Sequence, residues 1–460
     1  MKHIHLIGIG GTGMSAIARV LVESGYAVSG SDRNLSTLAA DLQRLGVQVS
    51  VGHSASNLQG ADTVVRSSAI PDENVEVQAA IQQGIPVLKR SEFLPLLMKD
   101  KSCIAISGTH GKTTTTAMFC WALYSLGKDP SYILGGVLKN LGTNAHAGRG
   151  KTFIIEADEY DRMFLGLTPE VILVTNVEYD HPDCFPTPAD YRSAFEQFVE
   201  RLTPGGLLVT NGDDHGSSQL RNHLPSNTRC VSCSLRTGAE YRAEKIRPNS
   251  IGGSTFEVTY NKQAGGAETI TVVSLQIPGE HNVRNALQVI AAIHQMGLPV
   301  NQAAQSLSEF KGTGRRFDIV GEVSGITVID DYAHHPTKIR ATLAAARSRF
   351  PNRRLVAVWQ PHTYSRTRAL EPQFIESLTN ADLVFVTEIY AAREKDESYS
   401  ARQLVEKMDR QHTFFTPTLA DATRLLMQKL QPGDVLVVLS AGDADQICYS
   451  VIKQLNERMG

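Results

Sequence analysis

The chain has 460 residues, which is too many for one hydrophobic core and suggests roughly two to four domains. Its 45 lysines and arginines balance 47 aspartates and glutamates, so no basic excess can hold a nucleic-acid backbone and we expect no nucleic-acid partner. A hydrophobic content of 42% and a charged content of 20% are ordinary for a soluble globular protein. No apolar run approaches the ~18–20 residues that cross a bilayer, which favours a cytoplasmic protein without a membrane partner.

Residues 1–99 are expected to form a first domain in which short strands alternate with helices. An apolar strand at 3–7 leads into a glycine-rich turn, and a helix follows at 14–23. Further strands are expected at 27–30, 47–49, 63–65 and 85–88, with a helix at 75–83. Strands separated by helices predict a parallel α/β sheet. Pro95 and the charged residues 99–101 mark the expected boundary.

Residues 100–313 and 314–460 are expected to form two further α/β domains. The second repeats the order strand, glycine turn and helix at 103–126, and adds strands at 152–156 and 171–175. A β-rich segment at 229–275 and a helix at 283–296 complete it. The third has strands at 326–329, 355–359, 383–386 and 435–439 with helices between them, which predicts another open sheet.

The most informative local pattern is the glycine turn of the second domain, between an apolar strand and a helix. That context is typical of a phosphate-binding loop, where backbone N–H groups and the helix dipole attract a polyphosphate. The strict pattern is not met, because Ile106 stands where its first glycine belongs, but the shorter Gly-x-x-Gly-Lys-Thr-Thr form is present. Lys112 can reach the β- and γ-phosphates, and the Thr113 hydroxyl can bind Mg²⁺. The predicted nucleotide-binding residues of this loop are Gly108, Thr109, His110, Gly111, Lys112, Thr113 and Thr114.

Carboxylates follow two strands of the same domain. Residues 153–155 form an apolar run that ends in Glu156, and the run at 171–175 is followed by Asp180 and His181. Ligands of open α/β sheets bind at the carboxyl ends of strands, and hard oxygen ligands suit Mg²⁺. An imidazole can complete or orient such a shell. We therefore expect a magnesium site near the phosphate loop.

The amino-terminal turn matches the GxGxxG pattern at residues 8–13, with Asp32 about twenty residues further on. This pattern is similar to a dinucleotide fingerprint, but its physical content is only a close approach of a pyrophosphate to the backbone. A uridine diphosphate fits as well as a nicotinamide dinucleotide. The separate ATP-type loop argues against a simple dehydrogenase. Cys230 and Cys233 form a lone CxxC without a second ligand pair, so we expect two thiols on opposite faces of a strand or turn.

Four further polar segments, marked by glycine or proline, lie at expected element boundaries. Any one of them could be an ordinary turn, and their joint occurrence argues against that interpretation. They span residues 279–286, 314–318, 330–336 and 360–368.

Taken together, these segments resemble the Mur ligases over essentially the whole chain. The resemblance rests on GTHGKTTT at 108–115, EADE at 156–159, Asp180-His181, HNVRN at 281–285, GRRF at 314–317 and DDYAHHP at 330–336. It implies an α/β fold of three domains: a Rossmann-like domain that binds a UDP-linked substrate, a central P-loop ATPase-like domain, and a Rossmann-like carboxyl-terminal domain that presents the amino acid. It also implies a cell-wall ligase that uses ATP and two Mg²⁺ ions and acts through an acyl-phosphate intermediate.

Within the family, the segments at 8–15, 67–70, 315–318 and 360–367 are similar to the members that join L-alanine to UDP-N-acetylmuramate. Glu-Ala-Asp-Glu-Tyr-Asp at 156–161 is similar instead to the recycling members that add a tripeptide to the same nucleotide. Ser440 also departs from the usual Gly-Ala-Gly-Asp. L-alanine and UDP-N-acetylmuramate are therefore the expected substrates, with the tripeptide as the alternative. A nicotinamide oxidoreductase and a nucleotide-sensing protein without turnover are the alternatives of other classes, and a monomer or weak homodimer is expected.

The resemblance also implies residue roles. Thr113, Glu156 and His181 would bind metal. Asn282, Asn285 and Arg316 would surround the adenine and phosphates, and Asp331 the ribose of ATP. Tyr332, His334 and Arg366 would face the amino acid, and Lys112, Glu156, His181, His334 and Arg366 form the expected catalytic set. The UDP-linked substrate would contact Gly8, Gly10, Gly11, Gly13, Asp32, His53, Ser67 and Ser68.

Overall fold

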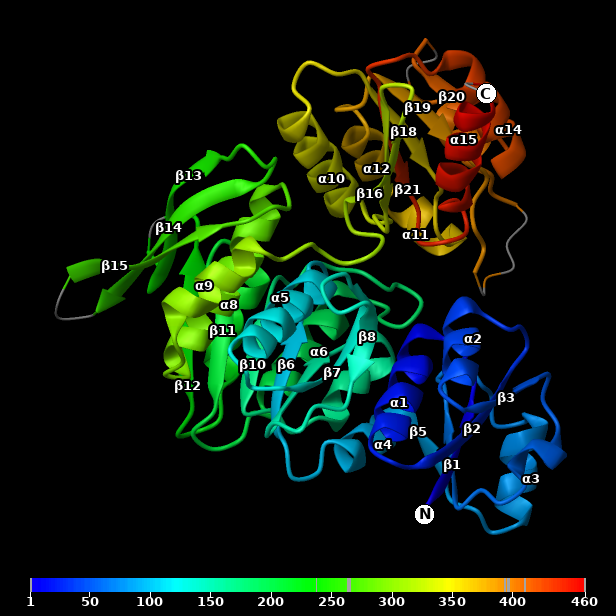
Figure 1. Ribbon diagram of the computed structural model, residues 1–460, viewed down its shortest axis with the longest axis vertical. Helices are drawn as coiled ribbons and strands as arrows, with labels where there is room; N and C mark the ends of the chain where they lie inside the picture. The colour runs from blue at the N-terminus through cyan, green and yellow to red at the C-terminus, as the bar shows by residue number, and fades with distance from the viewer. Residues whose placement is uncertain are drawn as a thin grey trace.

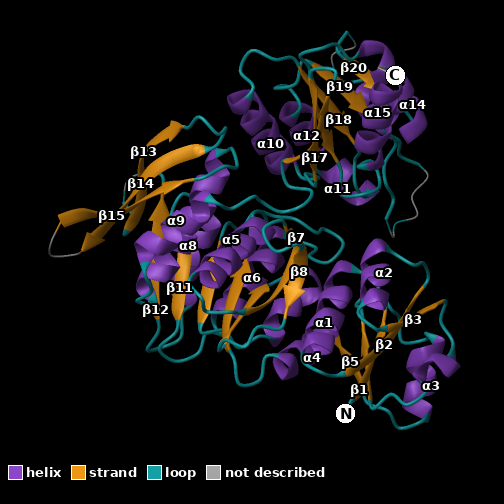
Figure 2. Cartoon of the chain, viewed as in Figure 1, coloured by secondary structure: helices purple, strands orange, loops and turns teal. Residues whose placement is uncertain are grey.

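A computed structural model describes residues 2–458 except 237, 263–265, 393, 395–397 and 409–410. It contains three separate sheets, each with helices packed against it, in the order of the sequence (Figure 2). The expected α/β fold in three parts is thereby confirmed. The expected boundaries near residues 99 and 313 fall between sheets, and their exact positions stay a prediction. No helix in the described part of the chain is long and apolar enough to span a membrane.

The first sheet has five parallel strands in the order β3-β2-β1-β4-β5. Its strands are β1 (His3–Ile7), β2 (Ala27–Asp32), β3 (Gln48–Val51), β4 (Thr63–Arg66) and β5 (Val87–Lys89). Its helices are α1 (Thr12–Glu23), α2 (Thr37–Arg44), η1 (Ala55–Leu58), α3 (Val75–Gln82) and α4 (Arg90–Leu97). The strand order reverses at β1, so the turn from β1 to α1 opens at the switch point where ligands of such sheets bind.

The central sheet has ten strands in the order β15-β14-β13-β12-β11-β10-β6-β9-β7-β8. Its strands are β6 (Ser102–Ser107), β7 (Ser131–Leu138), β8 (Thr143–His146), β9 (Thr152–Glu156), β10 (Val171–Val174), β11 (Leu207–Asn211), β12 (Arg229–Ser234), β13 (Tyr241–Pro248), β14 (Ser254–Lys262) and β15 (Gly266–Ser274). Its helices are α5 (Lys112–Ser125), η2 (Tyr160–Gly166), α6 (Pro188–Val199), α7 (His215–Gln219), η3 (Leu220–His223), α8 (Glu280–Gln295) and α9 (Val300–Ser308). Strands β7, β9, β6, β10 and β11 run parallel, so the ends of β6, β9 and β10 share one edge.

The third sheet has six strands in the order β16-β17-β21-β18-β19-β20, parallel except for β16. Its strands are β16 (Asp318–Val323), β17 (Ile326–Asp331), β18 (Leu355–Trp359), β19 (Leu383–Val386), β20 (Thr413–Phe415) and β21 (Val435–Leu439). Its helices are α10 (Pro336–Arg349), α11 (Tyr364–Ala369), α12 (Glu371–Ser377), α13 (Ala401–Val405), α14 (Leu419–Lys429) and α15 (Gln446–Glu457).

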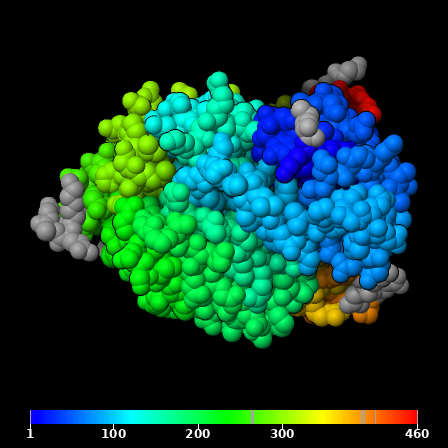
Figure 3. All heavy atoms as spheres, turned by 90° about the horizontal axis from the view of Figure 1, so that it is seen from below, coloured from blue at the N-terminus to red at the C-terminus, as the bar shows by residue number. Residues whose placement is uncertain are grey.

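The first block joins the central block through apolar packing. Helix α1 lies beside β7 and β8, and one core cluster contains buried side chains of both blocks, such as Ile17 and Phe153 (Figure 1). From below, the two blocks form one continuous surface (Figure 3). The third block has its own cores on the two faces of its sheet. Polar contacts from its loops reach the central block, among them the ion pair of Arg366 with Asp180.

Pro95, which was expected with residues 99–101 to mark the boundary of the first domain, lies near the end of α4, and the central sheet begins after it. The proline lies inside α4, where its missing N–H leaves the carbonyl of Ser91 without the usual helical partner. That carbonyl lies against Gly166 of η2 so closely that a Cβ atom on Gly166 would be 2.2 Å from it. The helix therefore packs closely against η2 at the turn that contains the proline.

Candidate active site

A cavity of about 910 Å³ is lined by residues of all three blocks. The phosphate loop of the central block and the start of α10 in the third block line it, together with the Ser67–Ser68 turn of the first block. Of the residues predicted from sequence, its lining includes Gly13, Ser67, Ser68, Thr109, His110, Gly111, Lys112, Thr113, Thr114, Glu156, His181, Asn282, Asn285, Arg316, Asp331, Tyr332, His334 and Arg366. Segments far apart in sequence thus meet around one space.

Two glycines give the phosphate loop its shape. Gly108 has a φ of 131°, and a Cβ atom there would lie 2.1 Å from Thr175 Oγ1. Gly111 has a φ of 79°, and its Cβ would lie 2.9 Å from the amide of Asn285. Both positions are in the left-handed region that favours glycine. The helix α5 begins directly after Gly111, so its free N–H groups face the cavity.

Lys112 forms a buried ion pair at the start of α5. Its Nζ donates to Glu159 Oε2 at 2.6 Å and to the carbonyl of Gly108 at 2.7 Å. Burial alone would lower the pKa of Lys112, but the charges of Glu159 and Asp158 raise it above its usual value. Burial would raise the pKa of Glu159, but the charge of Lys112 lowers it, and the pKa of Glu159 falls to about 2. The lysine is therefore a fixed cation beside the loop.

The oxygen atoms of Thr113 and Glu156 lie together, as the expected metal site requires. Thr113 Oγ1 donates to Glu156 Oε1 at 2.9 Å, and the Gly135 amide donates to Glu156 Oε2 at 2.6 Å. A hydroxyl and a carboxylate beside a phosphate loop fit the hard ligands that Mg²⁺ prefers. A Cβ at Gly135 would lie 2.8 Å from Glu156, so the strand leaves room only for that carboxylate.

His181 is farther along the same edge, in a strained turn. Its φ is 57°, and its amide donates to Asp180 Oδ1 at 2.8 Å. Its Nε2 lies 3.6 Å from Glu159 Oε1. Asp180 also accepts from Arg366 Nε at 2.9 Å, and both side chains of this pair are almost fully buried. Arg366 thereby reaches from α11 of the third block to the central block.

The remaining predicted residues of the third block surround the loop between β17 and α10. Asp331 accepts from the amides of Phe317 and Ala333 at 2.7 and 2.8 Å, so backbone groups already engage both carboxylate oxygens. The guanidinium of Arg316 lies 4.5 Å from the centre of the Tyr332 ring. His334 Nδ1 donates to the carbonyl of Tyr332 at 2.8 Å, which leaves Nε2 as its acceptor atom.

Several predicted contacts of the first block are outside the cavity lining, namely Gly8, Gly10, Gly11, Asp32 and His53, as is Gly108 of the phosphate loop. Asp32 Oδ2 accepts from the Gly10 amide at 2.9 Å. His53 Nδ1 lies 3.0 Å from Ser31 Oγ and 3.2 Å from the buried carboxylate of Glu76. In this structure both side chains brace the turns around the first sheet, and their contacts with a substrate stay predictions.

Three sequence models of one family match consecutive parts of the chain. The Mur ligase family catalytic domain matches residues 3–102, the Mur ligase middle domain 106–293, and the Mur ligase glutamate ligase domain 315–442. The chain belongs to the Mur ligase family. The resemblance found in the sequence is confirmed, and each family domain contains one of the three sheets.

Named Mur ligases match this chain over almost its full length. A UDP-N-acetylmuramate–L-alanine ligase of Acidithiobacillus ferrooxidans is 44% identical over 446 residues, which cover 96% of this chain and 95% of the relative. The solved UDP-N-acetylmuramate–alanine ligase of Thermotoga maritima superposes with a TM-score of 0.85 at 30% identity, covering 100% of both chains. A murein peptide ligase of Psychrobacter arcticus gives a TM-score of 0.74 at 27% identity, covering 99% of each.

Sequence reasoning left the partners of several charged residues around the cavity of this Mur ligase unassigned. Glu159 and Asp180 are buried partners of Lys112 and Arg366; the sequence placed Asp180 among the carboxylates that follow the strands, but it assigned neither ion pair. Lys338 lines the cavity from α10, and burial lowers its pKa to about 7 although Asp180 lies nearby. A lone lysine within a helix carries no motif, so the sequence could not distinguish it from a surface residue.

Proposed function

We propose that this chain joins L-alanine to UDP-N-acetylmuramate at the expense of ATP, giving ADP and phosphate. The single observation that carries the proposal is the cavity in which the phosphate loop, the first-block turn and the cationic third-block wall meet. Three reactants need such a space, because a ligase must hold a nucleotide, an acid and an amine together. The relatives that match this chain over almost its full length are named for the same two substrates, which supports the proposal.

The first step is transfer of the γ-phosphoryl group of ATP to the lactyl carboxylate of UDP-N-acetylmuramate. The carboxylate oxygen forms a bond to phosphorus while the bond to the ADP oxygen breaks, which gives an acyl phosphate. Positioning and neutralisation of charge dominate such a transfer. Lys112, held by Glu159, supplies a fixed positive charge at the start of α5, and Arg316 supplies another from the third block.

Thr113 and Glu156 would hold Mg²⁺, with His181 as the candidate for a second ion. When bound, Mg²⁺ neutralises phosphate oxygens during the transfer. The shared hydrogen bond of Thr113 and Glu156 keeps their oxygen atoms within reach of the loop. One or two ions remain alternatives within this proposal.

The second step is attack of the L-alanine amine on the acyl carbonyl. The new C–N bond gives a tetrahedral intermediate, and the C–O bond to phosphate then breaks while the amine loses its proton. Tyr332, His334 and Arg366 line the cavity on the third-block side and would bind the amino acid. The Arg366–Asp180 ion pair fixes that guanidinium, which is suited to the alanine carboxylate.

The reaction would place the chain in peptidoglycan precursor synthesis in the cytoplasm, and hence in cell-wall biogenesis, cell shape and cell division. The murein peptide ligase structure is the reason to keep a tripeptide as the competing second substrate.

Phosphate release from ATP tests the proposal directly. Purified enzyme with Mg²⁺ and UDP-N-acetylmuramate should release phosphate on addition of L-alanine, and a product of the expected mass should appear. Glycine, L-serine and the tripeptide are tested in the same way. Release that depends on the tripeptide but not on L-alanine would reassign the amine substrate, and no release with any of them would refute ligation.

A further inference from the structure

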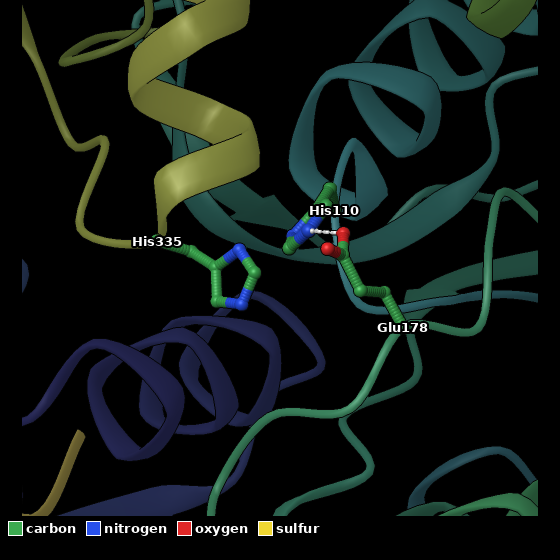
Figure 4. A group of neighbouring side chains, drawn as sticks. All are labelled: His110, Glu178 and His335. Carbon is green, nitrogen blue, oxygen red and sulfur yellow. Dashed lines mark hydrogen bonds and ion pairs between the residues drawn. The ribbon is translucent and has the colours of Figure 1, made fainter. Parts of the chain in front are cut away.

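The steps of the proposed reaction use none of the side chains of one cluster: His110, Glu178 and His335. One ligand atom from each residue lies within 4.8 Å of the others. Figure 4 shows the three side chains converging from different segments. His110 is in the phosphate loop, Glu178 follows β10, and His335 caps the start of α10. The cluster thus joins the central block to the third block.

Buried nitrogen atoms of this cluster lack partners among the described residues. His335 is only 3% exposed, and its Nε2 makes no hydrogen bond within the described chain. The Nδ1 of His110 is likewise buried without a bond to any described group. The ring centres of the two histidines are 4.8 Å apart. Since buried polar atoms normally form hydrogen bonds or bind a ligand, a ligand bound between the two histidines would account for these two nitrogen atoms.

The remaining contacts orient the carboxylate. Glu178 Oε2 accepts from His110 Nε2 at 2.7 Å, and Glu178 Oε1 accepts from the Thr337 hydroxyl at 2.7 Å. A hydroxyl that donates to the second oxygen of a carboxylate is the type of hydrogen bond that orients metal ligands.

The chemistry of the donors selects the kind of ion. Two imidazoles and one carboxylate are typical of Zn²⁺ and of other divalent first-row ions, whereas Mg²⁺ prefers oxygen atoms alone. Ligands of a tetrahedral zinc ion lie about 3.3 Å apart. The ligand atoms of the present cluster all lie within 4.8 Å of one another, so small side-chain movements would bring them to that spacing. His110 and Glu178 also line the cavity, so an ion can enter from it and keep a water molecule.

We propose that His110, Glu178 and His335 form a binding site for Zn²⁺ or a similar transition-metal ion. This site is separate from the oxygen-rich Mg²⁺ site at Thr113 and Glu156. Because its ligands come from two blocks, the ion binds with all three only while the third block is docked. A bound ion therefore clamps the third block onto the phosphate loop.

Cobalt provides a direct spectroscopic test in the full-length protein. Metal-free enzyme in excess Mg²⁺, without nucleotide, is titrated with Co²⁺ while visible absorption is recorded. We expect one equivalent to give the intense ligand-field bands of four-coordinate cobalt, and Zn²⁺ to abolish them. A wild-type protein that shows no such bands would overturn the proposal, whatever its ligase activity.

Variants locate the site. His335→Gln and Glu178→Gln should each weaken Co²⁺ and Zn²⁺ binding by ~100-fold or more, since loss of an outer contact alone costs ~10–100-fold. The matched control is His223→Gln, because His223 is 38% exposed and pairs with Glu196 on the surface. Unchanged affinity in the folded His335→Gln protein would overturn the assignment.

The clamp has its own readout. Zn²⁺ at one equivalent should make the wild-type protein more compact in small-angle scattering, and should leave the profile of His335→Gln unchanged. An identical response of both proteins would contradict the clamp. Neither measurement involves turnover, so failure here is distinguishable from failure of the proposed ligase reaction.

Discussion

Two glycine loops of this chain have the same position between a strand and a helix, but different charged groups surround them. The first joins β1 to α1 at residues 8–13, and the second joins β6 to α5 at residues 108–111. A buried glutamate lies near each of them, and its pKa is about 2 in both cases. At Glu159 the charge of Lys112 opposes the burial effect, whereas at Glu76 hydrogen bonds from Ser31, Asn57 and Ser54 do so, with His5 Nε2 at 3.7 Å.

The difference shows how the same local motif acquires different functions. Below the second loop, Lys112 forms an ion pair with Glu159 beside the cavity, and the lysine can turn toward a bound phosphate. Near the first loop, neutral donors satisfy the carboxylate, and Asp32 is engaged by the Gly10 amide. On the proposed function, the first loop would bind a nucleotide through its backbone, and the second would promote the reaction.

Lys112→Met should produce the largest effect and separate the two loops most clearly. Loss of a charge-stabilising group in phosphoryl transfer costs on the order of 10²–10³ in rate or more. UDP-N-acetylmuramate affinity, measured by calorimetry, should stay within about threefold of wild type, because its loop lies in another block. Since Glu159 would remain buried and unpaired, Lys112→Met/Glu159→Gln is the control for folding. Turnover within about tenfold of wild type would remove Lys112 from the mechanism.

The sequence predicted the loops and strands well because local patterns determine them. The apolar run at 3–7, the turn at 8–13 and the strand at 171–175 all match elements of the structure closely. The close packing of α4 against Gly166, about seventy positions after Pro95, could not be predicted because only the fold brings the two segments together. The ion pairs of Glu159 with Lys112 and of Asp180 with Arg366 were not predicted, because only the fold brings these partners together.

Glu76→Gln tests the hydrogen-bonded carboxylate of the first block. The folded pKa of about 2 lies below the unfolded value of about 4.3, so ionised Glu76 stabilises the fold above pH ~4.3 and this contribution is lost as pH falls toward 2. We expect the variant to lose on the order of 3 kcal/mol at pH 7. Urea unfolding at several pH values should show this deficit shrinking below pH ~4. A deficit independent of pH would mean that packing, not ionisation, is responsible.

Glu156→Gln should change the magnesium dependence of the second loop. The amide keeps one oxygen near Thr113 but removes the negative charge that attracts the ion. The Mg²⁺ concentration for half-maximal activity should rise by ~10–100-fold or more, by comparison with the loss of an outer contact. UDP-N-acetylmuramate binding in the absence of Mg²⁺ serves as the control. An unchanged Mg²⁺ requirement would show that the metal assignment is wrong.

Gly108→Ala and Gly11→Ala compare the backbones of the two loops. At Gly108 the positive φ and the contacts with Thr175 and Asn176 make any Cβ atom strained, so we expect a loss of ~1–3 kcal/mol and weaker ATP binding. At Gly11 the nearest atom to a new Cβ is the Gly8 carbonyl at 3.5 Å, an ordinary contact. Thermal unfolding should therefore barely change in Gly11→Ala. Equal losses in the two variants would contradict the comparison.

Asp32→Asn should have the smallest effect, and it tests whether the Asp32 carboxylate only holds the turn of the first loop or also contacts the substrate. Asparagine keeps an oxygen that can accept from the Gly10 amide, now at 2.9 Å from Asp32 Oδ2, while the charge is lost. A hydrogen bond to a charged group contributes only about 1 kcal/mol more than a neutral one, so stability should fall by that amount or less. Because the amide still holds the turn, affinity for UDP-N-acetylmuramate should decrease less than about tenfold, and ATP affinity should not change. Asp32→Ala is the matched comparison, since it removes the acceptor and should weaken substrate binding further. If Asp32→Asn instead abolishes substrate binding without loss of stability, the carboxylate must contact the substrate itself, and the first loop would then bind through a side chain, as we propose for the second.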